Sequence, residues 1–176
     1  MNEVFEEKRR RSRGRKHRRI VFAIAMLLAF AVAGRFRGEI ERFLSGGEER
    51  ATVTHVIDGD TVILADGRHV RYIGIDAPEL DSTTARTRDL AYRAKDFNAG
   101  LVEGKSVRLE YDLVRKDKYG RTLAYVYAGG ECAGARLVAE GLARAEFFGD
   151  NERHLDEYKR IEADAKEKRL GIWAAR

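Results

Sequence analysis

The spacing of apolar residues changes along the chain. Residues 20–33 form an unbroken apolar run, whereas from residue 51 onward apolar and polar positions alternate in short stretches. Such stretches, rich in β-branched and aromatic residues and bounded by glycine turns, are typical of strands. The predicted strands are residues 51–58, 61–65, 68–75, 106–112 and 121–128.

Helical spacing appears between and after these strands. Apolar residues three to four positions apart predict a helix over residues 89–102. A short helix over 135–141 and a longer one over 152–170 each end at a glycine. Because the strands and helices do not alternate as βαβ units, the pattern indicates an α+β fold. We expect a small curled antiparallel sheet or barrel with helices packed against it.

The apolar run follows a strongly basic segment. Nine Lys and Arg residues lie within residues 8–19, and such a charge excess keeps that end of an apolar segment in the cytoplasm. A helix over residues 20–33 would be about 21 Å long, shorter than the roughly 30 Å hydrocarbon core of a bilayer. Residues 20–34 are expected to be a transmembrane anchor or a signal segment cleaved near Ala33. We favour the anchor, because the basic leader is long.

These patterns divide the chain into four parts. They are a basic cytoplasmic tail (1–19), a single hydrophobic anchor or signal helix (20–34), a polar tether (35–50) and a folded domain (51–174). With an anchor, the chain crosses the cell membrane once and the domain lies outside. With a cleaved signal, the domain is secreted.

The net charge of +5 belongs to the N-terminal part. Residues 1–50 hold 13 of the 34 Lys and Arg residues and 7 of the 29 acidic residues, so the remainder carries a net charge of −1. A polyanionic substrate would therefore have to be held by locally placed arginines or with help from a cation. The single cysteine, Cys132, excludes a disulfide within the chain and a zinc knuckle.

The only proline, Pro78, stands between Asp76 and Glu79. Proline fixes its own φ and favours an extended conformation for the residue before it, so the two carboxylates are held on a stiff turn. Such rigidity is useful where one carboxylate ligates a metal and the other aligns a water. Asp58 and Asp60 flank a glycine at another strand end, a pattern that by itself is more typical of a tight turn.

Two arginines join these acids. Arg71 lies on the strand that leads to Asp76, and Arg121 follows the glycine turn of DKYGR (117–121). Each alone is typical of an ordinary strand or hairpin. Together with the acids they suit phosphodiester hydrolysis, because arginine binds phosphate bidentately. A hard cation held by carboxylates would neutralise the phosphate and position a water.

The succession of DGDT (58–61), RYIGIDAPE (71–79), DKYGR (117–121) and GIW (171–173) resembles the staphylococcal nuclease, or thermonuclease-like, family. The resemblance covers residues 51–174. It implies a five-stranded OB-fold β-barrel with packed helices, acting as a monomer. It also implies calcium-dependent hydrolysis of DNA and RNA that leaves 3′-phosphate ends.

The resemblance also implies roles for individual residues. Two carboxylates and one backbone carbonyl would ligate Ca²⁺, namely those of Asp60, Asp76 and Ala77. Glu79 would be the general base or orient the attacking water, while Arg71 and Arg121 would clamp the phosphate. Lys118 and Tyr119 would contact a neighbouring phosphate, and Asp58 would be an outer acid of the metal site.

Three features leave alternatives open. Ala77 stands where the best-known member has threonine, a change that a carbonyl ligand tolerates. Phe147 and Phe148 replace tyrosines that stack on a base, so they are expected either to stack or to lie in the core. Residues 80–88 are expected to form a mobile rim. The alternative function is a non-catalytic OB-fold module that binds nucleic acid at the cell envelope, which the complete set of acids argues against.

Overall fold

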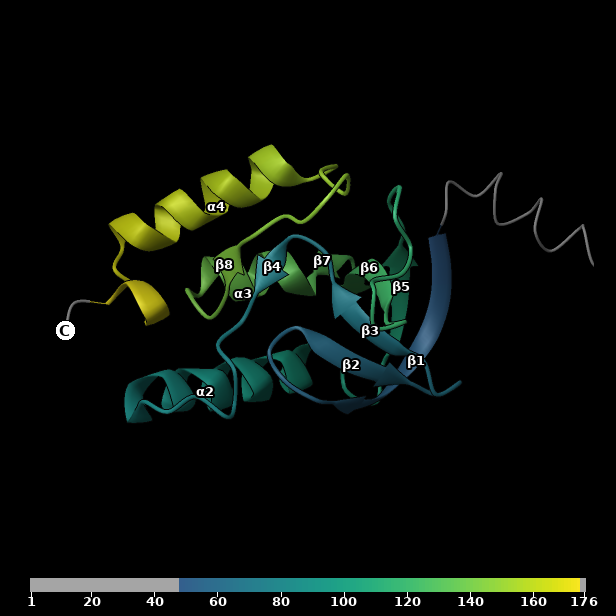
Figure 1. The fold of residues 1–176 in the computed structure, drawn as a ribbon, viewed down its shortest axis with the longest axis horizontal. Coiled ribbons are helices and arrows are strands. Elements are labelled where there is room, and N and C mark those ends of the chain that lie inside the picture. The colour runs from purple at the N-terminus through teal and green to yellow at the C-terminus, as the bar shows by residue number, and fades with distance from the viewer. Residues whose placement is uncertain (1–47, 175–176) are drawn as a thin grey trace, which may run out of the picture. The chain divides into compact units, whose positions relative to one another are not determined.

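The computed structural model describes residues 48–174 (Figure 1). The predictions for the basic tail, for the hydrophobic helix at residues 20–34 and for most of the tether lie outside the described residues. Within the described part of the chain, no helix is long and apolar enough to cross a membrane.

Five strands close into a barrel, which confirms the predicted α+β architecture. The strand order is β3-β2-β1-β5-β6, and the pairing of β3 with β6 completes the ring. That closing pair is parallel, whereas the other neighbours are antiparallel. The strands are β1 (Glu48–Val56), β2 (Thr61–Leu64), β3 (His69–Tyr72), β5 (Ser106–Glu110) and β6 (Thr122–Ala128).

Three helices and short strands lie beside the barrel (Figure 1). Helix α2 (Ala85–Val102) lies on one side of the domain and α4 (Leu155–Glu167) on the opposite side, with α3 (Ala133–Ala139) between them. A two-stranded ribbon of β4 (Ile75–Asp76) and β8 (Arg144–Ala145) also lies between these helices. The hairpin strand β7 (Glu131–Cys132) extends β6, and the 3₁₀ turn η1 (Gly171–Trp173) follows α4.

The alternation seen in the sequence fills the barrel, since successive side chains of a strand point to opposite faces. The fully or almost fully buried strand residues include Val53, Val62, Leu64, Val70, Tyr72, Val107, Leu109, Ala124 and Val126. Strand β6 also buries Tyr125 on its other face, where the ring packs edge-on at 6.2 Å from that of Tyr158 in α4. Both faces of β6 are therefore covered.

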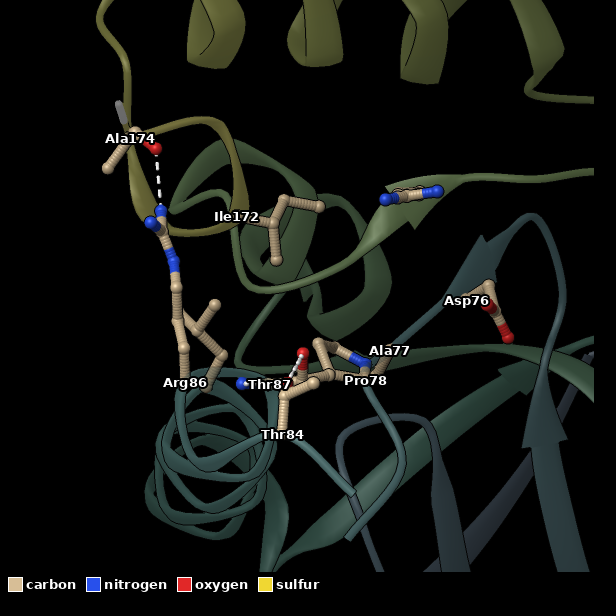
Figure 2. Close-up of a pocket in the computed structure, with 10 residues that line it drawn as sticks. Asp76, Ala77, Pro78, Thr84, Arg86, Thr87, Ile172 and Ala174 are labelled. Atoms are coloured by element: carbon tan, nitrogen blue, oxygen red, sulfur yellow. Dashed lines mark hydrogen bonds between the residues drawn. The ribbon is translucent and has the colours of Figure 1, made fainter. Parts of the chain in front are cut away.

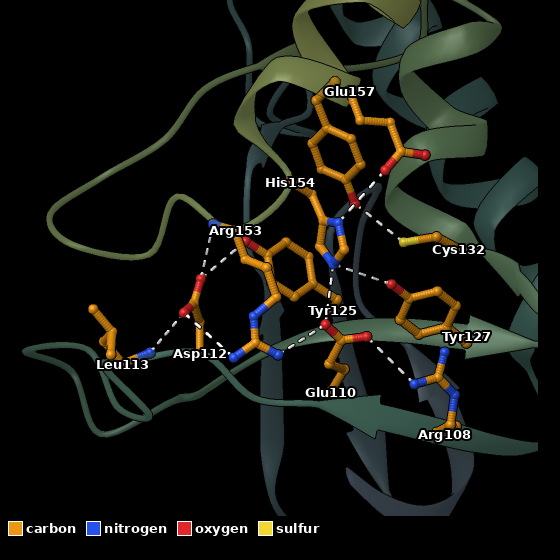
Figure 3. A network of polar contacts seen from close by, with 11 residues as sticks. Arg108, Glu110, Asp112, Leu113, Tyr125, Tyr127, Cys132, Arg153, His154 and Glu157 are labelled. Atoms are coloured by element: carbon orange, nitrogen blue, oxygen red, sulfur yellow. Dashed lines mark hydrogen bonds and ion pairs between the residues drawn. The ribbon is translucent and has the colours of Figure 1, made fainter. Parts of the chain in front are cut away.

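A polar network ties the barrel to the start of α4 (Figure 3). Its centre is Glu110 of β5, whose side chain is 12% exposed. The Glu110 Oε1 atom accepts a hydrogen bond from Arg153 Nη1 and lies 3.0 Å from His154 Nε2. These contacts fix the loop before α4, which borders the groove described below.

The predicted strand over residues 68–75 is broken after Tyr72. Gly74 has φ of +82°, a region that favours glycine, and the chain turns there. Ile75 and Asp76 then pair with Ala145 and Arg144 as a separate ribbon. A Cβ atom at Gly74 would lie 2.6 Å from a ring carbon of Phe147, so this position has no room for a side chain.

Of the other element bounds that differ from prediction, two have a clear physical origin. β1 begins at Glu48, so the last three residues assigned to the tether pair with β5 instead, although their charged sequence carries no strand pattern. Helix α2 begins at Ala85, earlier than predicted, because the Thr84 hydroxyl caps it by accepting the Thr87 N–H at 3.2 Å. Residues 85–88 of the predicted rim are thus helical.

Candidate active site

A groove of about 640 Å³ opens where three loops meet. The loops are the turn after β3, the β5–β6 connection and the segment between β8 and α4. Six of the nine residues proposed from the sequence line it: Arg71, Asp76, Glu79, Lys118, Tyr119 and Arg121. The other three, Asp58, Asp60 and Ala77, lie next to these along the chain or bind them.

Arg71 lies beside the groove and is bound by two carboxylates. Its Nη1 atom is 3.0 Å from Asp60 Oδ2, and its Nη2 atom is 3.0 Å from Asp76 Oδ1. Nη1 also donates to the carbonyl of Ile75 at 2.8 Å. The turn that carries Asp76 therefore folds around the guanidinium. Nη2 carries two of the five N–H groups of the arginine. The bond to Asp76 uses one of them, which leaves the other for a ligand.

Asp60 is the most deeply buried of these acids, with a side chain that is 7% exposed. It accepts the Ala77 N–H at 2.8 Å and the Thr61 hydroxyl at 3.0 Å. Burial raises its pKa to about 7 despite the opposing charge of Arg71, and repulsion from Asp58 adds to the rise. Asp58 in turn accepts the Asp60 N–H at 2.9 Å.

The two acidic turns are packed tightly together. A Cβ atom at Gly59 would lie 2.5 Å from the Ala77 Cβ and 2.9 Å from that of Ala94 in α2. Glycine at 59 and a small residue at 77 thus let the two strand ends approach each other. This contact is what allows the Ala77 N–H to reach Asp60 from a position 17 residues away.

Glu79 lies on the exposed rim of the groove, just after Pro78. Partial desolvation raises its pKa, and the charges of Asp58 and Asp76 raise it further, while Arg71 opposes them. The four carboxylates are therefore close enough to interact, with one buried guanidinium among them. A carboxylate with a raised pKa is suited to accept a proton near neutral pH.

Arg121 is held by an acid that the sequence reasoning did not single out. Asp117 accepts both the backbone N–H of Arg121 at 2.9 Å and its Nε–H at 2.7 Å. Asp117 also caps the turn by accepting the Tyr119 N–H at 2.9 Å. Because Asp117 binds Nε, the two terminal Nη groups of Arg121 can still donate to a ligand. The acid at the start of DKYGR was the available sequence signal.

The two phenylalanines have different environments, and only Phe147 takes the predicted place against the core. Phe147 packs against the core, with its ring 5.6 Å from that of Tyr158. Phe148 is 67% exposed and lines the groove. The exposed Tyr119, on the β5–β6 loop, lines the same groove. The groove thus offers two aromatic faces beside its charged residues.

Two buried asparagines position the walls and were missed from the sequence. Asn98 of α2 accepts the Tyr72 hydroxyl at 3.0 Å and donates to the Asp58 carbonyl at 3.2 Å. Asn151, which is 2% exposed, exchanges two hydrogen bonds with the backbone of Val114 at 2.7 and 2.8 Å. Each joins segments 26 or more residues apart. Contacts at that separation cannot be predicted from a local sequence pattern.

The donor chemistry of this corner fits a hard cation. Within residues 48–174, no group of three or more His, Cys, Asp or Glu side chains is placed to hold one metal ion. The acids nonetheless outnumber the arginine among them, and Asp60 is a buried carboxylate whose charge Arg71 does not fully offset. Ca²⁺ takes six to eight oxygen ligands, to which carbonyls and waters contribute beside carboxylates. The oxygens that would hold it are those of Asp60, Asp76 and the Ala77 carbonyl.

Comparison with known proteins places these features in a family. Residues 69–175 match the family described as staphylococcal nuclease homologue. The chain is 34% identical over 163 residues to a thermonuclease of Staphylococcus hyicus, covering 88% of this chain and 95% of that protein. It is 41% identical over 128 residues to a thermonuclease of Staphylococcus intermedius, covering 71% and 76%. It is also 36% identical over 128 residues to the endonuclease YncB of Bacillus subtilis (strain 168), covering 70% and 61%. The chain belongs to the staphylococcal nuclease family.

Proposed function

We propose that this protein is a calcium-dependent nuclease that hydrolyses phosphodiester bonds of DNA and RNA and leaves 3′-phosphate ends. The observation that carries the proposal is the groove in which Asp76, Glu79, Arg71 and Arg121 meet. Acids and guanidiniums alternate there, with Arg71 bound between Asp60 and Asp76. The thermonuclease and endonuclease relatives support the same reaction.

The charged residues of the groove have different roles in the reaction. Glu79, at the exposed rim, accepts a proton from the attacking water or orients it. The guanidiniums of Arg71 and Arg121 bind the phosphoryl oxygens, on which charge builds up in the transition state. Arg121 also lies near the leaving oxygen, and Asp117 holds it in place.

The flanking residues hold the strand. Lys118 and Tyr119 lie on an exposed turn of the β5–β6 loop and contact a neighbouring phosphate. Phe148, exposed in the same groove, stacks on a base, a contact that does not depend on base identity. This division explains how a domain with little net charge binds a polyanion.

Calcium is the ion that the family resemblance implies. When bound, it neutralises the phosphate and positions the water. Asp60, Asp76 and the Ala77 carbonyl would hold it, and Asp58 fixes Asp60 by accepting a hydrogen bond from the Asp60 N–H. Binding the ion would relieve the cost of the buried Asp60 charge.

We also propose that the domain works outside the cell, anchored by residues 20–34 or secreted after cleavage near Ala33. The nine Lys and Arg residues within 8–19 support this orientation. Protease added to intact cells should digest the domain of an anchored chain. A domain that is digested only after lysis would overturn the proposal.

The test of activity uses the full chain with single-stranded DNA, plasmid and RNA. With CaCl₂ we expect new ends that carry 3′-phosphates, shown by mapping end-labelled products before and after phosphatase treatment. Equal cleavage in excess chelator would refute the calcium dependence. Saturable binding without any new ends would show a binding module in place of a nuclease.

A further inference from the structure

A second cavity, of about 720 Å³, lies next to the groove (Figure 2). Asp76 borders both, so the two spaces meet at this residue. The second cavity lies between the turn at Pro78, the start of α2 and the 3₁₀ turn η1 with Ala174 after it.

Two arginines line this cavity from distant parts of the chain. Arg86 comes from the first turn of α2 and donates to the Ala174 carbonyl at 2.6 Å. Arg144 comes from β8, where its backbone pairs with that of Asp76. The Arg144 guanidinium lies 5.6 Å from the Trp173 ring centroid.

Within residues 48–174, neither of these two side chains is ion-paired with a carboxylate, in contrast to several other arginines near the barrel. Arginines that are ion-paired with Asp or Glu include Arg68, Arg71, Arg108, Arg121, Arg136 and Arg153. Among the described residues that line the cavity, Asp76 alone carries a carboxylate, and that carboxylate is already bound by Arg71. The cavity is therefore a site with positive charge available to a ligand.

The rest of the lining matches a nucleotide better than a small anion. Thr84 and Thr87 bring hydroxyls, and Leu90, Pro78 and Ile172 bring apolar surface. Ligand cavities generally combine apolar walls with a few polar groups that fix orientation. A phosphate would engage the guanidiniums bidentately, and a sugar or base would lie against the apolar wall.

We propose that this cavity binds the nucleotide flanking the cleaved bond on the side opposite Lys118 and Tyr119. The nucleic-acid strand would run along the groove, with the phosphate of the cleaved bond near Asp76. It would then continue into the space between Arg86 and Arg144. This inference rests on the proposed function, because it takes the groove as the place of cleavage. It adds a second anchoring point for single-stranded or locally opened nucleic acid.

The test compares strand lengths in the full chain carrying Glu79→Gln, which suppresses cleavage. Affinities for fluorescent thymidine oligonucleotides of one to six residues are measured in CaCl₂ by anisotropy, with and without R86Q/R144Q. For strands that reach the cavity we expect about tenfold weaker binding. Because the cavity holds one nucleotide and therefore one phosphate, the slope of log K against log salt should become shallower by about 0.7. A mononucleotide should bind equally well to both proteins.

Two further variants make the result specific. K159Q/R160Q removes the same charge from the exposed face of α4, away from both cavities, and should bind every length as the parent does. R86K/R144K keeps the charge and should recover most of the affinity. Thermal unfolding of each variant checks the fold.

Two results would overturn the proposal. They are equal affinity of R86Q/R144Q at every length, and an equal loss at every length that includes the mononucleotide. The proposed function fails separately, if the chain with Glu79 intact does not cleave nucleic acid. In that case the length dependence of binding still decides the role of the cavity.

Discussion

The guanidinium of Arg71 lies 3.0 Å from the carboxylate of Asp60, and both side chains are shielded from solvent, at 13% and 7% exposed. Buried ion pairs cost desolvation that their attraction offsets only in part. The raised pKa of Asp60, about 7, is the sign of this imbalance. The site is therefore built at the expense of stability.

The first prediction concerns Asp60→Asn in the absence of divalent ions. Because the folded-state pKa of Asp60 lies above its unfolded value, its contribution to stability is full below pH 3.8 and is lost as the pH rises through about 7. Asparagine does not ionise, so at pH 8 the variant should be more stable by about 1–2 kcal/mol. Urea unfolding in chelator at pH 8, 6 and 4 should show this gap closing as the pH falls.

Asp66→Asn is the matched control for that experiment. Asp66 is half exposed, and hydrogen bonds from Arg68 lower its pKa, so its replacement should not stabilise the protein at pH 8. A less stable Asp60→Asn variant at pH 8 would contradict the account of the site. Its nuclease activity should be lost in any case.

Glu79→Gln should lower kcat by a factor of about 10²–10⁴, the usual contribution of a general base. KM should change little, because the neutral amide keeps the shape of the side chain at the exposed rim. Steady-state cleavage of single-stranded DNA in CaCl₂ measures both constants. Glu167→Gln, at an exposed position at the end of α4, is the control. A fully active Glu79→Gln enzyme would remove Glu79 from the mechanism.

Arg121→Gln should lower kcat by a factor of about 10²–10³, because it removes donors to oxygens that gain charge in the transition state. Asp117→Asn should have a smaller effect, since Asp117 positions Arg121 through its Nε–H and backbone N–H and does not itself bind the phosphate. The same cleavage assay decides both. The control is Arg136→Gln, which breaks a surface pair with Glu131. If Asp117→Asn were as damaging as Arg121→Gln, Asp117 would have a direct role.

Gly74→Ala should lower the free energy of unfolding by about 2–4 kcal/mol, because the new methyl group would overlap two aromatic rings packed against it. Its Cβ would lie 2.6 Å from Phe147 and 2.7 Å from Tyr158. Gly67 has nearly the same φ, +83°, with open space around it, so Gly67→Ala should cost only about 1 kcal/mol. Urea unfolding compares the two. Equal losses would mean that backbone strain, and not packing, makes glycine necessary at position 74.

The Glu110 network of Figure 3 should make stability depend on acid pH. Burial alone would raise the pKa of Glu110, but hydrogen bonds from His154, Arg153 and Tyr127 outweigh it and lower the pKa. The stability that Glu110 contributes is thus present above its unfolded pKa, near 4.5, and is lost as the pH falls through the folded value. Glu110→Gln should be less stable than the parent at pH 7, and urea unfolding at lower pH should show this difference shrinking. A constant difference down to pH 3 would contradict it.

Local patterns in the sequence were sufficient for most of the barrel strands and for several charged residues of the groove. Alternation predicts strands because successive side chains point to opposite faces of a sheet. Asp76, Glu79 and Arg121 stand at turns marked by proline or glycine, which are readable without a structure. The division of charge between residues 1–50 and the remainder also needs the sequence alone.

Other features depended on contacts between distant segments. Phe147 and Phe148 are adjacent and chemically identical, yet one packs on Tyr158 and the other is exposed in the groove. Which of them faces the core is set by the ribbon that β8 makes with β4. Arg86 and Arg144 are 58 residues apart along the chain and meet at one cavity only after folding. Short-range spacing records the periodicity of each element, whereas the meeting of these side chains depends on how the elements pack and pair.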